Sequence, residues 1–178
     1  MKYVRLIAIC GVMTALAAAL AAVERILPVF LIIPLPGVKL GLANIVTLVA
    51  LFTMGGFPAF CILTARCLLG WFFGSGVTGL LFSLTGGFVS LGVMWLLKRF
   101  CAGAHTTDRK GFFSLYGVSM AGAAAHNIGQ IGAAMVLLGS FALLRYLPVL
   151  LIASIATGLA VGALSDGTLK RLRGLNLV

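Results

Sequence analysis

The sequence predicts an all-α integral membrane protein, a bundle of six transmembrane helices with both termini in the cytoplasm. Of its 178 residues, 62% are hydrophobic and only 9% are charged, and the mean hydropathy is +1.20. Several apolar stretches approach the roughly 20 residues that a helix needs to cross a bilayer. Strands of alternating polarity are absent, which favours helices over a barrel. We therefore expect one transmembrane domain, residues 1–178, in a bacterial cytoplasmic membrane as a multi-pass protein.

The first predicted helix covers about residues 5–23. Lys2 and Arg5 precede an alanine-rich apolar run, so a cleaved signal peptide is one interpretation. The run from Leu6 to Val23 is longer than the apolar part of a usual signal peptide, and further apolar segments follow it. We therefore expect a retained membrane helix here.

The stretch 40–73 is apolar apart from Arg66 and is interrupted by the sequence GGFP at residues 55–58. As one helix it would be on the order of 50 Å long, well beyond the membrane thickness. A Gly-Gly turn followed by a proline at a helix start instead predicts two short helices, at about 40–55 and 57–73.

Three further helices are predicted at about 77–97, 112–138 and 147–165, and the charges support the total of six. With this topology the cytoplasmic side holds nine basic residues and the outer side three, in keeping with the positive-inside tendency. Joining the second and third helices would move the basic segment 98–110 to the outside. Topology and anionic lipid headgroups also account for the net charge of +10, so we expect no nucleic-acid partner.

Small residues form rows in two of the predicted helices, and such rows allow close backbone contact in lipid. The helix at 112–138 carries Gly117, Ala121, Ala125, Gly129 and Ala133, for which we expect internal packing. The first helix carries Gly11 and four alanines that either pack inside the bundle or form a docking face for another membrane protein, namely Ala15, Ala18, Ala19 and Ala22.

Polar residues at membrane depth are the candidate ligand-binding residues, because a charge there is costly unless it faces protein, water or a ligand. Asn44 shares a helix face with Thr47, and His126 lies one turn before Gln130. The candidate substrate-binding residues are Lys39, Asn44, Arg66, His126, Asn127 and Gln130.

The environment of Arg66 can be interpreted in two ways. The chain has only three acidic residues that could pair with it. Glu24 is expected at the outer surface, and Asp108 and Asp166 at the cytoplasmic face, so no buried carboxylate is expected beside Arg66. In one interpretation, backbone carbonyls and the polar residues near 126–130 cap its guanidinium as a structural network. In the other, Arg66 opens into a polar cavity and receives an anionic or strongly polar group.

Enzyme chemistry is disfavoured, because paired-carboxylate, aspartate-Mg²⁺ and Ser-His-Asp mechanisms all need carboxylates at depth. The four cysteines have no metal-ligand spacing, and neither GxGxxG after a strand nor a Walker A motif is present. We therefore expect no metal, no cofactor and no intrinsic ATP hydrolysis. Any active transport would take its energy from a partner or a gradient.

The segment PGVKLGLANIVTLVALF at 36–52, the mid-helix Arg66 and the sequence HNIGQ at 126–130 together resemble the Gx transporter family. Its members are often labelled heptaprenyl diphosphate synthase component I. The similarity runs through nearly the whole chain, and KLGLAN is its most distinctive part. More distantly, the six short helices and the alanine-rich first helix are similar to the substrate-binding S components of energy-coupling factor (ECF) transporters.

The ECF resemblance implies a solute uptake subunit, in which the segment 24–39 would cover an outward-facing pocket that the six candidate residues line. The first helix would slide, through Ala15, Ala18, Ala19 and Ala22, against a transmembrane scaffold that two ATPases drive. The isoprenoid label implies instead a noncatalytic membrane partner of a soluble prenyl diphosphate synthase. Catalytic prenyl synthases hold Mg²⁺-diphosphate on DDxxD motifs, whereas Asp108 and Asp166 lie in no such motif.

Overall fold

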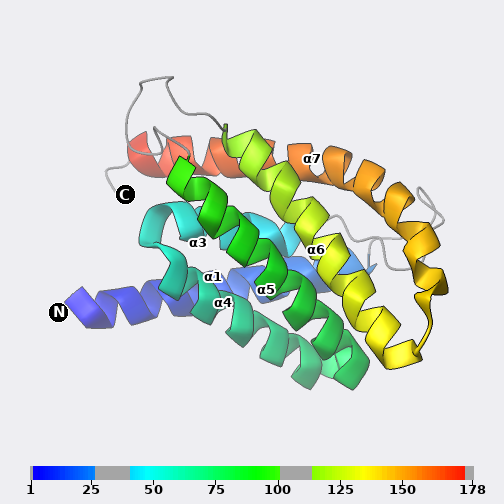
Figure 1. Ribbon diagram of the computed structural model, residues 1–178. Coiled ribbons are helices and arrows are strands. Elements are labelled where there is room, and N and C mark those ends of the chain that lie inside the picture. The colour runs from blue at the N-terminus through cyan, green and yellow to red at the C-terminus, as the bar shows by residue number, and fades with distance from the viewer. Residues whose placement is uncertain (1, 27–40, 101–113, 175–178) are drawn as a thin grey trace.

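The computed structural model describes residues 2–26, 41–100 and 114–174, and every regular element in these ranges is a helix (Figure 1). The predicted all-α class is confirmed for this part of the chain. The elements are α1 (Lys2–Ile26), α3 (Leu42–Met54), α4 (Gly56–Gly70), the π-helical turn η1 (Trp71–Ser75), α5 (Gly76–Phe100), α6 (Leu115–Leu138), the 3-10 helix η2 (Phe141–Tyr146) and α7 (Leu147–Gly174).

Four of the described stretches are long and apolar enough to cross a membrane, namely Val4–Glu24, Gly56–Arg99, Leu115–Leu138 and Phe141–Gly174. The apolar helix α3 is shorter, at 13 residues. A membrane protein is therefore supported, while the count of six spans and the orientation of the termini stay predictions.

The 44-residue apolar stretch Gly56–Arg99 folds back on itself as a helical hairpin. The backbone leaves helical geometry at Phe73 and at Gly74, whose φ of 91° favours glycine. Residues equally far from this bend meet across the hairpin: the rings of Phe60 and Phe88 stack with centroids 5.2 Å apart. Figure 1 shows α4 and α5 running in opposite directions from the bend. The break falls between the two helices that the sequence predicts.

The turn predicted at the Gly-Gly pair is present between α3 and α4. Gly55 has a φ of 96°, and its N–H donates to the carbonyl of Ala50 over 3.2 Å. Pro58 follows in the first turn of α4, where a missing N–H costs no helical hydrogen bond.

The predicted end of the last helix is wrong: α7 continues to Gly174 rather than ending near residue 165. Asp166 and Lys170 form an i,i+4 ion pair of 2.7 Å in the added part. Likewise, α1 extends to both sides of the predicted 5–23. Hydropathy marks the part of a helix that suits lipid, and a helix can continue beyond it with polar residues.

The short helix α3 is the centre of the bundle, and eight of its 13 residues are buried. It contacts α1, α4, α5 and α7, and Leu48, Ala50 and Leu51 are fully enclosed. Its sequence, LANIVTLVALFTM, is apolar on every side, the pattern of a helix surrounded by other helices. Because α3 is enclosed, a polar residue near its start has to face protein or a cavity.

Glycines bring α5, α6 and α7 into close backbone contact. A Cβ on Gly129 of α6 would lie 2.9 Å from the Cα of Gly86 on α5, so these two glycines face one another. A Cβ on Gly158 of α7 would lie 2.6 Å from the Cα of Met120 on α6. The hydroxyl of Ser119 donates to the carbonyl of Gly158 over 2.7 Å. Gly129 thus packs inside the bundle, as expected for the small residues of this helix.

The small residues of α1 lie mainly on its outer side. Ala17, which lies outside the predicted rows, is the fully buried alanine that joins the core. Of the four alanines of the predicted docking face, Ala18 is partly covered and the others are exposed, namely Ala15, Ala19 and Ala22. Their exposure is compatible with a docking face, and the docking function stays a prediction.

Lys98 joins α5 to the end of α3, and its loss should destabilise the bundle. Its ammonium donates to the carbonyl of Leu51 over 2.6 Å and lies 5.4 Å from the ring centroid of Phe52. A charged donor at the end of a helix satisfies a terminal carbonyl and complements the helix dipole. We expect Lys98→Met to lower the free energy of unfolding by about 1.5 kcal/mol, measured by denaturation in detergent.

Lys170→Met is the matched control, because Lys170 is exposed and forms its ion pair with Asp166 of the same helix. An equal loss of stability in both variants would show that the contact with α3 contributes nothing.

Candidate functional site

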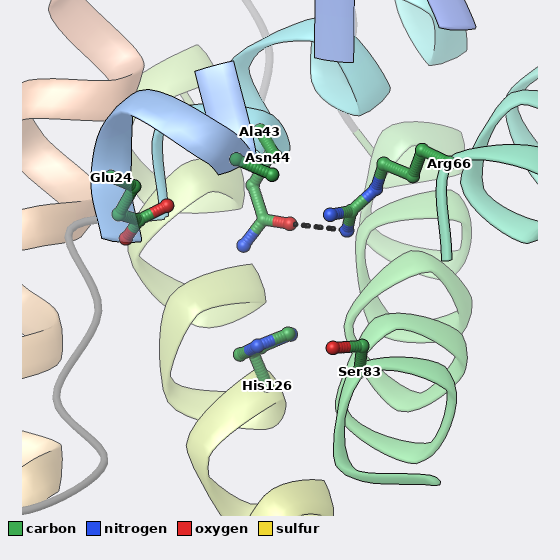
Figure 2. Close-up of a pocket in the computed structure, with 7 residues that line it drawn as sticks. Glu24, Ala43, Asn44, Arg66, Ser83 and His126 are labelled. Atoms are coloured by element: carbon green, nitrogen blue, oxygen red, sulfur yellow. Dashed lines mark hydrogen bonds between the residues drawn. The ribbon is translucent and has the colours of Figure 1, made fainter. Parts of the chain in front are cut away.

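A polar cavity of about 130 Å³ lies among five helices, with Asn44 of the central helix on its wall (Figure 2). Its lining comes from α1, α3, α4, α5 and α6, and consists of Ala21, Glu24, Ala43, Asn44, Arg66, Ser83 and His126. The lining residues run from position 21 to position 126, so the site exists only in the assembled bundle.

Arg66 and Asn44 form the one hydrogen bond that joins two side chains of this cavity in Figure 2. The Nη2 of Arg66 donates to the Oδ1 of Asn44 over 3.2 Å. The Nε of Arg66 is buried and has no hydrogen-bond partner within the described residues. A guanidinium has five N–H donors, and the hydrogen bond to Asn44 uses one of them.

Gly41 sets the positions of both Asn44 and Glu24. It is the N-cap of α3 with a φ of 74°, a conformation that glycine adopts at little cost. Its carbonyl accepts the N–H of Asn44 over 2.8 Å, and its own N–H donates to the Oε1 of Glu24 over 2.5 Å. The central glycine of KLGLAN thereby connects the end of α1 to the start of α3 at the cavity wall.

Ser83 of α5 and His126 of α6 form the opposite part of the wall and face one another in Figure 2. The close packing of α5 on α6 brings them there. A Cβ on Gly86, one turn after Ser83, would lie 3.0 Å from the Cε1 of His126. Glycine at this position therefore leaves room for the imidazole.

The structure brings together three of the six candidate residues, Asn44, Arg66 and His126, and separates two others. The Nδ2 of Asn127 donates to the carbonyl of Leu150 on α7 over 3.0 Å. Gln130 borders a different, mainly apolar cavity of about 310 Å³ between α5, α6, η2 and α7. Lys39 and the predicted lid segment beyond residue 26 lie outside the described residues.

Two polar residues of the cavity, Glu24 and Ser83, were not among the candidates. Glu24, which the sequence placed at the outer surface, is partly buried and lines the same cavity as Arg66. Sequence spacing placed Glu24 at the outer end of the first helix, but not beside Gly41. A usable signal was that Glu24 is the one of the three acidic residues that the predicted topology places on the outer side, near Asn44.

The cavity combines a carboxylate, a guanidinium, an amide, a hydroxyl and an imidazole, and can therefore bind a polar ligand with charge-assisted hydrogen bonds. Across the ranges 2–26, 41–100 and 114–174, no three histidine, cysteine, aspartate or glutamate side chains gather in a way that would hold a metal ion.

The family model described as heptaprenyl diphosphate synthase component I matches residues 13–168, which include every lining residue of the polar cavity. Neither the curated proteins nor the solved structures contain a match to this chain.

Proposed function

The chain belongs to the heptaprenyl diphosphate synthase component I family. For this member of the family, we propose that it is the membrane-embedded substrate-binding subunit of a solute uptake transporter. It would capture a small polar or anionic compound in an outward-facing pocket and have no catalytic activity of its own. The observation that carries this proposal is the polar cavity around Arg66, which brings a guanidinium, a carboxylate, an amide and an imidazole to one space.

The energetic cost of this cavity supports a binding role. Charged and polar side chains inside a membrane protein are expensive and usually mark a substrate or ion pathway. Arg66 lines this cavity and gives one of its five N–H donors to Asn44, so the guanidinium can offer further donors to a ligand.

The proposed assembly follows the ECF resemblance. Six spans with cytoplasmic termini would leave the cavity open toward the outside, and α1 would contact a transmembrane scaffold coupled to ATPase subunits. The exposure of Ala15, Ala19 and Ala22 on α1 supports such a contact, because small residues allow close helix approach in lipid.

A second candidate function is a noncatalytic membrane subunit in polyprenyl diphosphate or quinone synthesis. The family description favours it, because it names a component of a heptaprenyl diphosphate synthase. The chain would then bind a soluble prenyl diphosphate synthase, which would carry out the reaction.

Native mass spectrometry of the protein extracted gently from its own membrane tests both functions. For the uptake function we expect a bound small molecule, with scaffold and ATPase subunits, and loss of that molecule in Arg66→Ala. Arg145→Ala is the matched control, because Arg145 is an exposed arginine in η2. A protein without small molecules but with an attached prenyl synthase would contradict uptake and support the second function.

A further inference from the structure

The cavity that Gln130 borders, which we call the apolar cavity, has a volume of about 310 Å³ and lies between α5, α6, η2 and α7. Spaces larger than a water molecule are few in protein interiors, because side chains pack closely. An apolar space of about 150 Å³ is already enough to bind benzene. The apolar cavity therefore has room for a small organic molecule that contains a ring.

The turn after α6 builds one wall of the apolar cavity. The C-cap of α6 is Gly139, whose φ of 61° suits glycine, and the Oγ of Ser140 accepts the N–H of Ala142 at the start of η2. A 3-10 helix has three residues per turn, so Leu143 and Tyr146 lie on the same face of η2. Both line the cavity, and η2 contacts α6 and α7.

The walls that come from α5, α6 and α7 are apolar except at Gln130. Their apolar side chains are those of Phe82, Ile131, Ala134 and Leu150. Gln130 lies one turn before Ala134, and its Cγ packs against α5, where a Cβ on Gly86 would lie 2.8 Å away. The amide of Gln130 makes no hydrogen bond to another of the described residues. The cavity thus combines an apolar surface with one available amide.

These walls determine which ligand chemistry is favourable. An amide in apolar surroundings gains free energy from a hydrogen bond that hydrocarbon cannot provide. The Gln130 amide has two donors and an acceptor, so a hydroxyl, carbonyl or amide group of a ligand can pair with it. A charged ligand is disfavoured, because no charged residue is present among the described lining residues.

We propose that the apolar cavity is a second binding site, for a small neutral molecule with an apolar body and one polar group that hydrogen-bonds to Gln130. The body fills the space beside Ala134, the smallest side chain of the wall. This inference is independent of the polar cavity and of the proposed uptake function, which concerns polar or anionic solutes. It also gives Gln130 a ligand of a different class from the one that the sequence predicted.

The test compares four probes that share one fluorinated ring, by fluorine NMR on the purified full-length protein in detergent. They are para-fluorobenzyl alcohol, para-fluorotoluene, para-fluorobenzoate and para-fluorobenzylamine. We expect the alcohol to bind saturably, and more than about tenfold more tightly than the benzoate or the benzylamine, because both of these carry a charge.

Two variants separate binding in the apolar cavity from partition into the micelle. Ala134→Phe should abolish saturable binding of the alcohol, because its ring occupies the cavity. Val136→Phe is the matched control on the same helix, since Val136 is 84% exposed and does not line the cavity, and it should bind as the wild type does. Equal binding by these two variants would show that the probe lies elsewhere.

Gln130→Leu tests the hydrogen bond. The affinity of the alcohol relative to that of para-fluorotoluene should fall about fivefold, since the toluene has no polar group to lose a partner. An unchanged ratio would overturn the role of Gln130.

The wild-type series decides the proposal if a variant fails to fold. A charged probe that binds as tightly as the alcohol, or the absence of saturable binding by the alcohol, would overturn the second site. Neither result bears on the proposed uptake function, which native mass spectrometry of the Arg66→Ala variant tests separately.

Discussion

Gly158→Ala is expected to cause the largest loss of stability among single-methyl changes in the bundle, about 3 kcal/mol. The added Cβ would lie 2.6 Å from the Cα and 3.0 Å from the backbone nitrogen of Met120. Backbone atoms cannot rotate away as a side chain can, so α7 and α6 would have to separate. The separation would also stretch the 2.7 Å hydrogen bond from Ser119 to the Gly158 carbonyl.

Chemical denaturation of the purified protein in detergent measures this loss, with circular dichroism to report helix content. Gly167→Ala is the matched control in the same helix, since a Cβ there meets nothing within 4 Å. Alanine should stabilise that position slightly through its higher helix propensity. Equal stability of the two variants would show that α6 and α7 do not approach as closely as described.

Gly129→Ala should affect both stability and the polar cavity. Its Cβ would lie 2.9 Å from the Cα of Gly86 and 2.9 Å from the carbonyl oxygen of Thr85, both on α5. Relief of these contacts moves α6 away from α5, at a cost of about 2 kcal/mol. Ser83 and His126 lie on these two helices, so we also expect weaker ligand binding.

Gly132→Ala tests whether the effect is specific, because a Cβ at Gly132 of α6 meets nothing within 4 Å. Thermal unfolding and ligand titration should both be close to wild type in this variant. If Gly129→Ala retains full stability, the α5–α6 contact does not hold the cavity together.

The sequence predicted those residues of the candidate site that stand out individually as polar side chains within apolar segments. Arg66, Asn44 and His126 are polar residues within apolar helices, and the bundle brings these three together. Asn127 and Gln130 carry the same signal, yet one binds a carbonyl of α7 and the other borders a second cavity. Polarity at depth shows that a partner is needed, but it does not tell whether that partner is a ligand or a neighbouring helix.

The sequence by itself determined the helical class, the membrane character, the turn at Gly55 and the break after Phe73. These features follow from local composition and from the conformational preferences of glycine and proline, which act within a few residues. Only the tertiary structure decided that α3 is the enclosed centre and that Glu24 meets Gly41 across 17 positions of sequence. That contact depends on how the helices rotate and pack, and packing is set by distant surfaces that a linear pattern does not record.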